Sequence, residues 1–225
     1  MNFMPMPFSR WLNARGSAAL CLASFALLAG CSFTNPPVRP VVYDFGPGIV
    51  DAVSAALPSA AVTAAVTPPI TLAEVESPPA LDSTAVLYRL GYADAQQLHP
   101  YAQARWTMPP AQLLRQRLRE HLSRRRTVLS QGDTGPAPGI VLRVELDEFS
   151  QWFDTPQSSS ALVRLRATLL QPGPNGVRLS AQQNFVVQRA AVSADAPGGV
   201  KAMAQASDAL IAQLDAWLQA TMVAP

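Results

Sequence analysis

Three consecutive segments between residues 140 and 187 alternate apolar and polar residues, and this pattern constrains the fold more than any other feature. Because neighbouring side chains of a β-strand point to opposite faces of a sheet, such alternation predicts strands with one covered and one solvated face. The residues expected to face the core are Ile140, Leu142, Val144 and Leu146, then Ala161, Val163, Leu165, Ala167 and Leu169, then Leu179, Ala181, Phe185 and Val187. After Glu148 the apolar phase shifts to Phe149, which predicts a β-bulge near Asp147.

Shorter strands are expected upstream of this run. They are residues 41–45, 70–76 and 85–90, with residues 97–106 as an irregular hairpin partner of the last. Each is rich in apolar or β-branched residues and ends near glycine or proline, which favour turns.

Two helices are expected to cover the sheet. Residues 109–110 are both proline and preset the first turn of a helix whose apolar stripe repeats at Leu114, Leu118 and Leu122. A second helix is predicted from about Val200 to Met222. Together these elements predict an α+β fold, an antiparallel sheet of about five or six strands with two helices packed on one face.

The first thirty residues have the three parts of a bacterial secretory signal. Arg10 and Arg15 supply the basic start, residues 18–29 are apolar, and Leu-Ala-Gly stands directly before Cys31. This lipobox predicts that Cys31 becomes the acylated first residue of a lipoprotein, carrying a diacylglyceryl thioether and an N-acyl chain. The apolar stretch would span about 18 Å as a helix, against about 30 Å for a hydrocarbon core, so a transmembrane anchor is disfavoured. An uncleaved signal anchor or a soluble exported form are the alternatives.

Cleavage before Cys31 would change the charge and the cysteine content. It leaves 15 of the 17 basic residues beside 15 acidic ones, so no nucleic-acid partner is expected, because such partners attract basic surfaces. Cys21 leaves with the signal, and acylation uses the sulfur of Cys31, which excludes a disulfide or a thiolate metal site in the mature monomer. The mature domain must therefore be held together by its apolar core.

Composition divides the chain into three parts. Residues 1–30 are the expected signal peptide, and residues 31–40, with three prolines among the last five, are expected to be a membrane tether. Residues 41–225 are expected to form a single α+β domain. Within it, the Ala- and Pro-rich segment at about 49–69 has no steady period and is expected to be flexible.

The sequence contains no motif of an enzyme site. It lacks a nucleophile elbow, a phosphate-binding loop and a zinc-binding His-Glu-x-x-His, so no catalytic residue, cofactor or metal site is expected. His99 and His121 lack ligand spacing, which favours solvated or packing roles. Asp147 and Glu148 are neighbours in a predicted strand and point to opposite faces, so they are interpreted as surface residues at the bulge.

Two further features have a structural and a functional interpretation. Residues 124–126 are three arginines at the end of a predicted helix, where cations complement the negative pole and Glu120 can pair with Arg124. The alternative is a contact with anionic phospholipid or an acidic partner. Trp106, followed by Met108, is expected to fill the core at a strand-to-helix junction rather than to form a ligand platform.

Several short motifs together resemble one known family. They are the lipobox, Val42-Tyr43-Asp44-Phe45-Gly46, Leu87-Tyr88-Arg89, Arg105-Trp106 with Pro109-Pro110, Asp147-Glu148-Phe149, and Trp217-Leu218. In this order they resemble the ABC-type transport auxiliary lipoprotein family, over nearly the whole mature chain. Two departures concern the early topology, because the segment at 49–69 is longer than expected and Tyr43 stands alone where a pair of tyrosines is common.

The resemblance implies a non-enzymatic periplasmic lipoprotein, anchored at the outer membrane. Its implied partner is an MCE-domain protein with an ABC permease and ATPase complex that moves lipids across the envelope. Ser32 fits the outer membrane, because the usual inner-membrane retention signal is an Asp directly after the acylated cysteine. Only Cys31 maps onto a defined chemical role. Ring-shaped assemblies occur in such systems, so a homo-oligomer is also compatible with the resemblance.

Two rival functions stay open at this point. One is an envelope assembly lipoprotein that acts as a plug or chaperone for an outer-membrane barrel, and the other is a periplasmic hydrolase. In the leading hypothesis the acyl chains hold one end of the protein at the membrane, and the edge or the solvated face of its sheet binds the partner.

Overall fold

The computed structural model describes residues 38–47, 68–130, 133, 139–173 and 176–223. The chain divides into two compact units, Met1–Arg39 and Pro40–Pro225, and the described helices and strands all lie in the second. The predicted signal peptide, Cys31, most of the predicted tether and nearly all of the predicted flexible segment lie outside the described residues.

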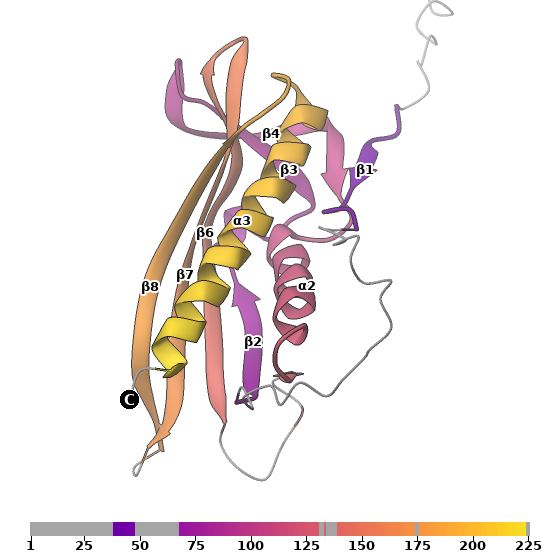
Figure 1. Cartoon of the computed structure of the whole chain (residues 1–225). Helices are drawn as coiled ribbons and strands as arrows, with labels where there is room; N and C mark the ends of the chain where they lie inside the picture. The colour runs from indigo at the N-terminus through magenta and orange to yellow at the C-terminus, as the bar shows by residue number, and fades with distance from the viewer. Residues whose placement is uncertain (1–37, 48–67, 131–132, 134–138, 174–175, 224–225) are drawn as a thin grey trace, which may run out of the picture. The chain divides into compact units, whose positions relative to one another are not determined.

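The described residues of the second unit form eight strands and two α-helices (Figure 1). In chain order they are β1 (Val41–Tyr43), β2 (Ile70–Glu76), the short 3₁₀ helix η1 (Pro79–Leu81), β3 (Ala85–Leu90), β4 (Asp94–Trp106), α2 (Pro110–Ser123), β5 (Val128–Ser130), β6 (Ile140–Thr155), β7 (Ser158–Gly173), β8 (Gly176–Ala190) and α3 (Ala196–Val223). The predicted α+β class and both predicted helices are confirmed. The hairpin of residues 85–90 and 97–106 is also confirmed, as β3 and β4 with register shifts between them.

Strand β6 is the centre of the sheet. On one side it pairs antiparallel with β7, which pairs antiparallel with β8. On its other side it pairs in parallel with β2 and, further along, with β3. Strand β5 pairs in parallel with β2, β4 pairs antiparallel with β3, and β1 pairs in parallel with β4. The sheet is therefore larger than predicted, and it contains both parallel and antiparallel pairs. The sequence pattern could not predict these pairs, because alternation of residue types reports which face is covered but not which strands pair.

Both helices begin where local chemistry favours it. Pro110 occupies the first turn of α2, where its missing N–H costs no hydrogen bond. The carboxylate of Asp195 accepts a hydrogen bond from the backbone N–H of Gly198 at 2.8 Å, which caps the start of α3. A hydrogen bond from the Ser193 hydroxyl is the main reason that the pKa of Asp195 is lowered.

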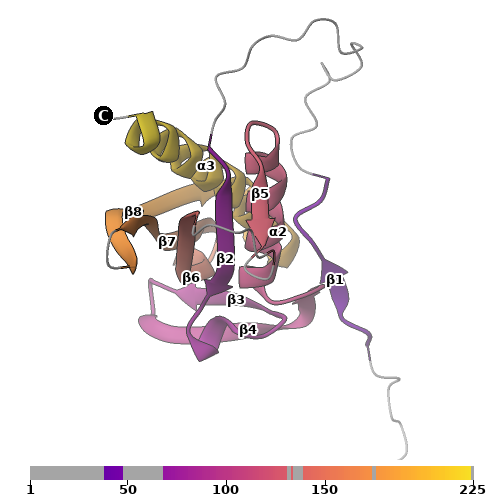
Figure 2. The same cartoon turned by 90° about the horizontal axis from the view of Figure 1, so that it is seen from below.

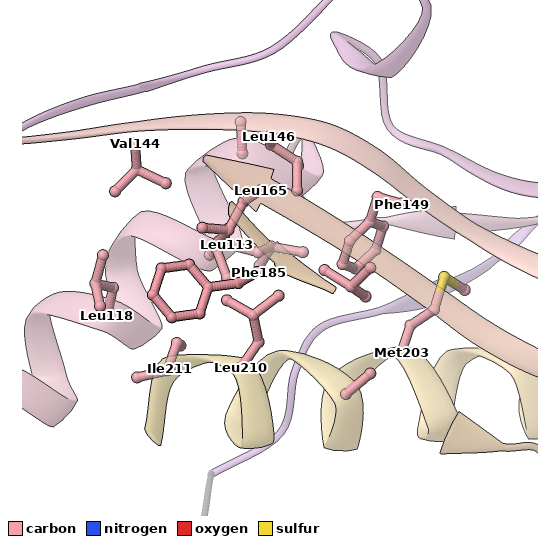
Figure 3. Close-up of a cluster of buried hydrophobic side chains, with 14 of the residues drawn as sticks. Leu113, Leu118, Val144, Leu146, Phe149, Leu165, Phe185, Met203, Leu210 and Ile211 are labelled. Carbon is pink, nitrogen blue, oxygen red and sulfur yellow. The ribbon is translucent and has the colours of Figure 1, made fainter. Parts of the chain in front are cut away.

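The core lies between the sheet and the two helices. Helix α3 runs along β6, β7 and β8, and α2 lies beside it against β2 (Figures 1 and 2). The core-facing residues predicted for the first two long strands are confirmed: Leu142, Val144, Leu146 and the whole predicted set of β7 are at most 1% exposed, and Ile140 is half-buried against the core. Figure 3 shows Leu146, Leu165 and Phe185 of the sheet beside Leu210 and Ile211 of α3.

Two irregularities in strand pairing bear on the predicted faces, one in β6 and one in β8. The register of β6 and β7 shifts between Leu146 and Glu148, as the change of apolar phase predicted. In β8, however, Leu179 is 60% exposed, so its predicted core position is wrong. The register shifts here too, because Ala181 pairs with Leu169 and Leu179 with the next residue along β7. This irregularity reverses the face that Leu179 occupies.

The two faces of β7 make a direct prediction about stability. Leu165→Asp should destabilise the protein by more than about 4 kcal/mol, because it places an unpaired charge at a fully buried position. Arg164→Ser changes an exposed neighbour and should stay within about 0.5 kcal/mol of the wild type. Urea unfolding followed by circular dichroism measures both. Equal stability of the two variants would show that the faces are assigned wrongly.

Candidate functional site

Three aromatic residues that are far apart in the sequence meet in the core. Phe45 follows β1, Trp106 ends β4 and Phe149 lies in β6 just after the bulge. Their ring centroids are 5.7 to 5.8 Å apart and all three side chains are buried. Such distances are typical of edge-to-face and stacked aromatic pairs. The predicted core role of Trp106 is confirmed, and the cluster fastens the segment after β1 to the centre of the sheet.

Arg117 of α2 fixes the same segment through its backbone. Its guanidinium donates hydrogen bonds to the carbonyl oxygens of Phe45 and Gly46 at 2.5 and 2.8 Å. It also lies 6.0 Å from the centre of the Phe45 ring, and its Nε is 3.5 Å from a carboxylate oxygen of Asp208 in α3. The arginine is only 8% exposed. One buried cation therefore joins α2, α3 and the turn after β1.

The buried role of Arg117 was not predicted from the sequence. A signal was present, because Arg117 is three residues after Leu114 and directly before Leu118, which places it beside the apolar stripe of α2. Burial raises the pKa of Asp208, and this effect exceeds the lowering by the Arg117 charge.

A second set of ion pairs joins α2 and α3 nearer the end of α2. The buried carboxylate of Asp215 lies 3.4 Å from Arg126, 3.4 Å from His121 and 4.0 Å from Arg125. It also accepts a hydrogen bond from Gln219 at 3.0 Å. Residues 124–126 follow the end of α2, as predicted, but Arg126 is buried, with a side chain that is 1% exposed, and its pairing with Asp215 was part of neither interpretation. A carboxylate on α3 supplies its partner, and no periodicity in α2 reveals that.

The two carboxylates at the bulge contact different arginines. Glu148 forms an ion pair with Arg89 of β3 at 3.1 Å, and Arg89 also donates to two carbonyl oxygens at the start of β4. Asp147 lies 4.0 Å from Arg166 of β7. Glu148 is only 7% exposed, so its predicted surface position is wrong. The adjacent strand β3 covers it, and that pairing could not be read from the sequence.

The histidines occupy separate environments. His99 stacks on the ring of Tyr88 with centroids 5.2 Å apart, and His121 lies in the ion-pair set of Asp215. Nearby, the Tyr101 hydroxyl donates to the side-chain carbonyl oxygen of Gln151 at 2.8 Å, and burial raises the pKa of Tyr101. Within the described residues, no group of three or more His, Cys, Asp or Glu side chains is arranged to hold a metal ion.

An open groove of about 560 Å³ lies beside the fastened segment. One wall is formed by residues 42–47 and Thr107, and the other by the face of α3 that runs from Pro197 to Asp208. Lys201, which is the only lysine of the chain, lies on this wall. The groove, the aromatic cluster and Arg117 together form the candidate functional site. Among the described helices, none combines the length and the hydropathy that a membrane crossing requires.

A family model described as the ABC-type transport auxiliary lipoprotein component matches residues 52–215, which is most of the chain. The chain belongs to this family. The predicted resemblance is therefore confirmed, and the protein is an auxiliary lipoprotein component of ABC-type transport. The family is one of transport lipoproteins and is not a known enzyme family.

Solved structures show that other proteins share the fold of this auxiliary lipoprotein. A protein from Xanthomonas campestris, XCC0632, superposes with a TM-score of 0.61 at 21% identity, covering 69% of this chain and 86% of its own. A second, described as an uncharacterized protein, superposes with a TM-score of 0.56 at 14% identity, covering 80% of this chain and 99% of its own. No match was found among curated proteins.

The family match does not include every part of the packed domain of the auxiliary lipoprotein. Phe45 precedes the matched range and Trp217 follows it. Both are nevertheless packed on the matched part, Phe45 on Trp106 and Phe149, and Trp217 on Phe185 with ring centroids 5.9 Å apart. The packed unit therefore extends beyond the matched range in both directions.

Arg117 and Arg115 offer a matched test of the fastening. Arg117→Gln should destabilise the protein by about 2–4 kcal/mol, because it removes a buried cation and leaves Asp208 and two carbonyl oxygens without their partner. Arg115→Gln removes only an ion pair with the exposed Glu74 and should cost less than about 1 kcal/mol. Urea unfolding measures both. A small effect of Arg117→Gln, similar to that of Arg115→Gln, would contradict the assigned role.

Proposed function

We propose that this auxiliary lipoprotein is a non-enzymatic subunit of an MCE-type lipid transport system, held at the periplasmic face of the outer membrane by acylated Cys31. It acts by holding its partner protein at a fixed place beside the membrane. The lipid anchor fixes the protein at the bilayer, and the α+β domain docks an MCE-domain protein that is served by an inner-membrane permease and ATPase.

The fastening of the segment after β1 is the observation that carries this proposal. In the sequence, residues 31–40 are the proposed tether, and β1 begins at the next residue. Ten extended residues reach at most about 36 Å, so the domain would be kept close to the bilayer. A pull on the tether would be resisted by the pairing of β1 with β4, by the buried Phe45 ring and by Arg117. A subunit that acts by position needs such a connection.

The charged groups between α2 and α3 support a binding role rather than catalysis. Arg117 pairs with Asp208 of the groove wall, and Arg126 and His121 contact Asp215 further along α3. Ion pairs of this kind hold helices together, whereas a general acid or base needs access to its substrate. The alternative function, a plug or chaperone for an outer-membrane barrel, would use the same anchor but a different partner.

Three variants next to the proposed cleavage site test the anchor and its membrane. Cys31→Ser should move the protein from the membrane fraction to the soluble periplasm or leave it unprocessed, because no acyl chains can be attached. Ser32→Asp should move it from outer-membrane to inner-membrane fractions, while Ser32→Ala stays with the outer membrane. Density-gradient fractionation with immunoblotting reads all three. An unchanged position of Cys31→Ser would contradict the lipid anchor, and inner-membrane location of the wild type would contradict the proposed membrane.

Cross-linking in intact cells tests the partner. The wild-type protein, cross-linked and purified in detergent, should retain an MCE-domain protein identified by mass spectrometry. Recovery of an outer-membrane barrel in its place would favour the alternative function. Turnover of a lipid or glycan substrate by the purified protein, abolished by a single substitution, would contradict a non-enzymatic role.

A further inference from the structure

Strand β8 forms one edge of the sheet over its whole length. It pairs with β7, and no described residue pairs with its other side. From Ala181 to Ala190 the ladder with β7 has no register shift, so this part of the edge is regular over about 33 Å. Half of its backbone N–H and C=O groups point away from β7, which is the geometry that an added strand requires.

The edge lacks most of the devices that protect free edges. Proteins block such edges with charged side chains, especially lysine, and with proline, bulges or short strands, and β8 carries charged side chains only near its two ends. Strand β8 has 15 residues, contains neither lysine nor proline, and carries its irregularity only near its start. Three of its side chains, Val177, Leu179 and Val186, are apolar and 57–60% exposed. An unprotected edge with exposed apolar side chains is typical of a docking surface.

The charged residues at this edge of the sheet are all basic. Strands β7 and β8 together contain four arginines, namely Arg164, Arg166, Arg178 and Arg189, and no acidic residue. The acidic contacts described for this group come from β6, where Glu145 and Asp147 lie 3.6 and 4.0 Å from Arg166. Arg178 and Arg189 lie near the two ends of β8, directly on the edge. A partner strand would therefore meet positive charge at both ends of the edge.

We propose that β8 binds an extended acidic segment of a partner protein, which adds to the sheet as a further strand. The backbone of the segment would pair with the free edge, apolar residues would cover Val186 and Leu179, and Asp or Glu residues would face Arg178 and Arg189. This inference rests on the proposed docking role and names the surface and the chemistry of the partner.

Charge also argues against a second copy of this chain on the same edge. Two antiparallel β8 strands in full overlap would bring Arg178 of each copy close to Arg189 of the other. Four arginines would then share one seam without an acidic residue, and like charges opposite one another destabilise a sheet. An anionic lipid surface could neutralise the arginines but could not satisfy the regular row of edge N–H and C=O groups.

Site-specific photo-cross-linking tests the proposal in the full-length, membrane-bound protein. A benzophenone amino acid replaces Gln182 or Asn184 on β8, or Gln112 on α2 as a control, all of which are exposed. After irradiation of intact cells, mass spectrometry maps the attached peptide. The β8 positions should yield a peptide of another protein that is rich in Asp or Glu and free of proline, and the Gln112 position should not.

Charge variants supply the second measurement. Changing both Arg178→Glu and Arg189→Glu should lower the cross-link yield at Asn184 by about tenfold, because each change replaces an attractive cross-strand charge pair by a repulsive one. The control Arg143→Glu reverses an exposed cation on β6, two strands away from β8, and should leave the yield unchanged. Thermal unfolding checks that each variant is folded.

Several outcomes would overturn the proposal. They are a cross-link to a second copy of this chain, a cross-link to a neutral or basic segment, no protein cross-link, or a yield that does not respond to the two arginine changes. If an MCE-domain protein is still recovered by cross-linking elsewhere on the surface, only the β8 edge is refuted. Loss of that partner as well would refute the proposed function.

Discussion

Strand β6 is the constraint on which the rest of the structure depends. Its sixteen residues pair with β7 on one side and with β2 and β3 in succession on the other. The two halves of the sheet are therefore joined through β6. The bulge after Leu146 lets the strand change phase and still place Phe149 in the core. Beside the bulge, Glu148 is held by Arg89 of β3. A straight strand of the same sequence would expose Phe149 and separate these contacts.

The same region explains why short motifs that are far apart in the sequence belong together. Phe45, Trp106 and Phe149 come from three different motifs and form one aromatic cluster. Arg117 then adds hydrogen bonds to the backbone beside Phe45 and an ion pair to α3. The result is a firm attachment of the segment that follows the proposed tether. For an auxiliary lipoprotein, this attachment would link the proposed membrane anchor to the α+β domain.

The sequence was sufficient for features that depend on local periodicity and insufficient for those that depend on pairing. Alternation located the buried residues of β6 and β7 and the bulge near Asp147, because burial of one sheet face imposes a period of two. It could not reveal the parallel pairs of β6 with β2 and β3, which join strands separated by long connections. For the same reason Glu148 was placed on the surface although β3 covers it, and the pairing of Arg126 with Asp215 of α3 was not predicted. Leu179 was misplaced because an irregularity in β8 is invisible in a pattern of small and polar residues.

The central claim is that a lipid on the first mature residue ties this domain to a membrane, and the mass of the amino-terminal peptide tests it most directly. The protein purified from cell envelopes in detergent can be digested and its amino-terminal peptide analysed by mass spectrometry. The account predicts that the peptide begins at Cys31 and carries a diacylglyceryl thioether and an amide-linked acyl chain. A peptide with an unmodified Cys31 sulfur, or one that begins upstream of Cys31, would contradict it.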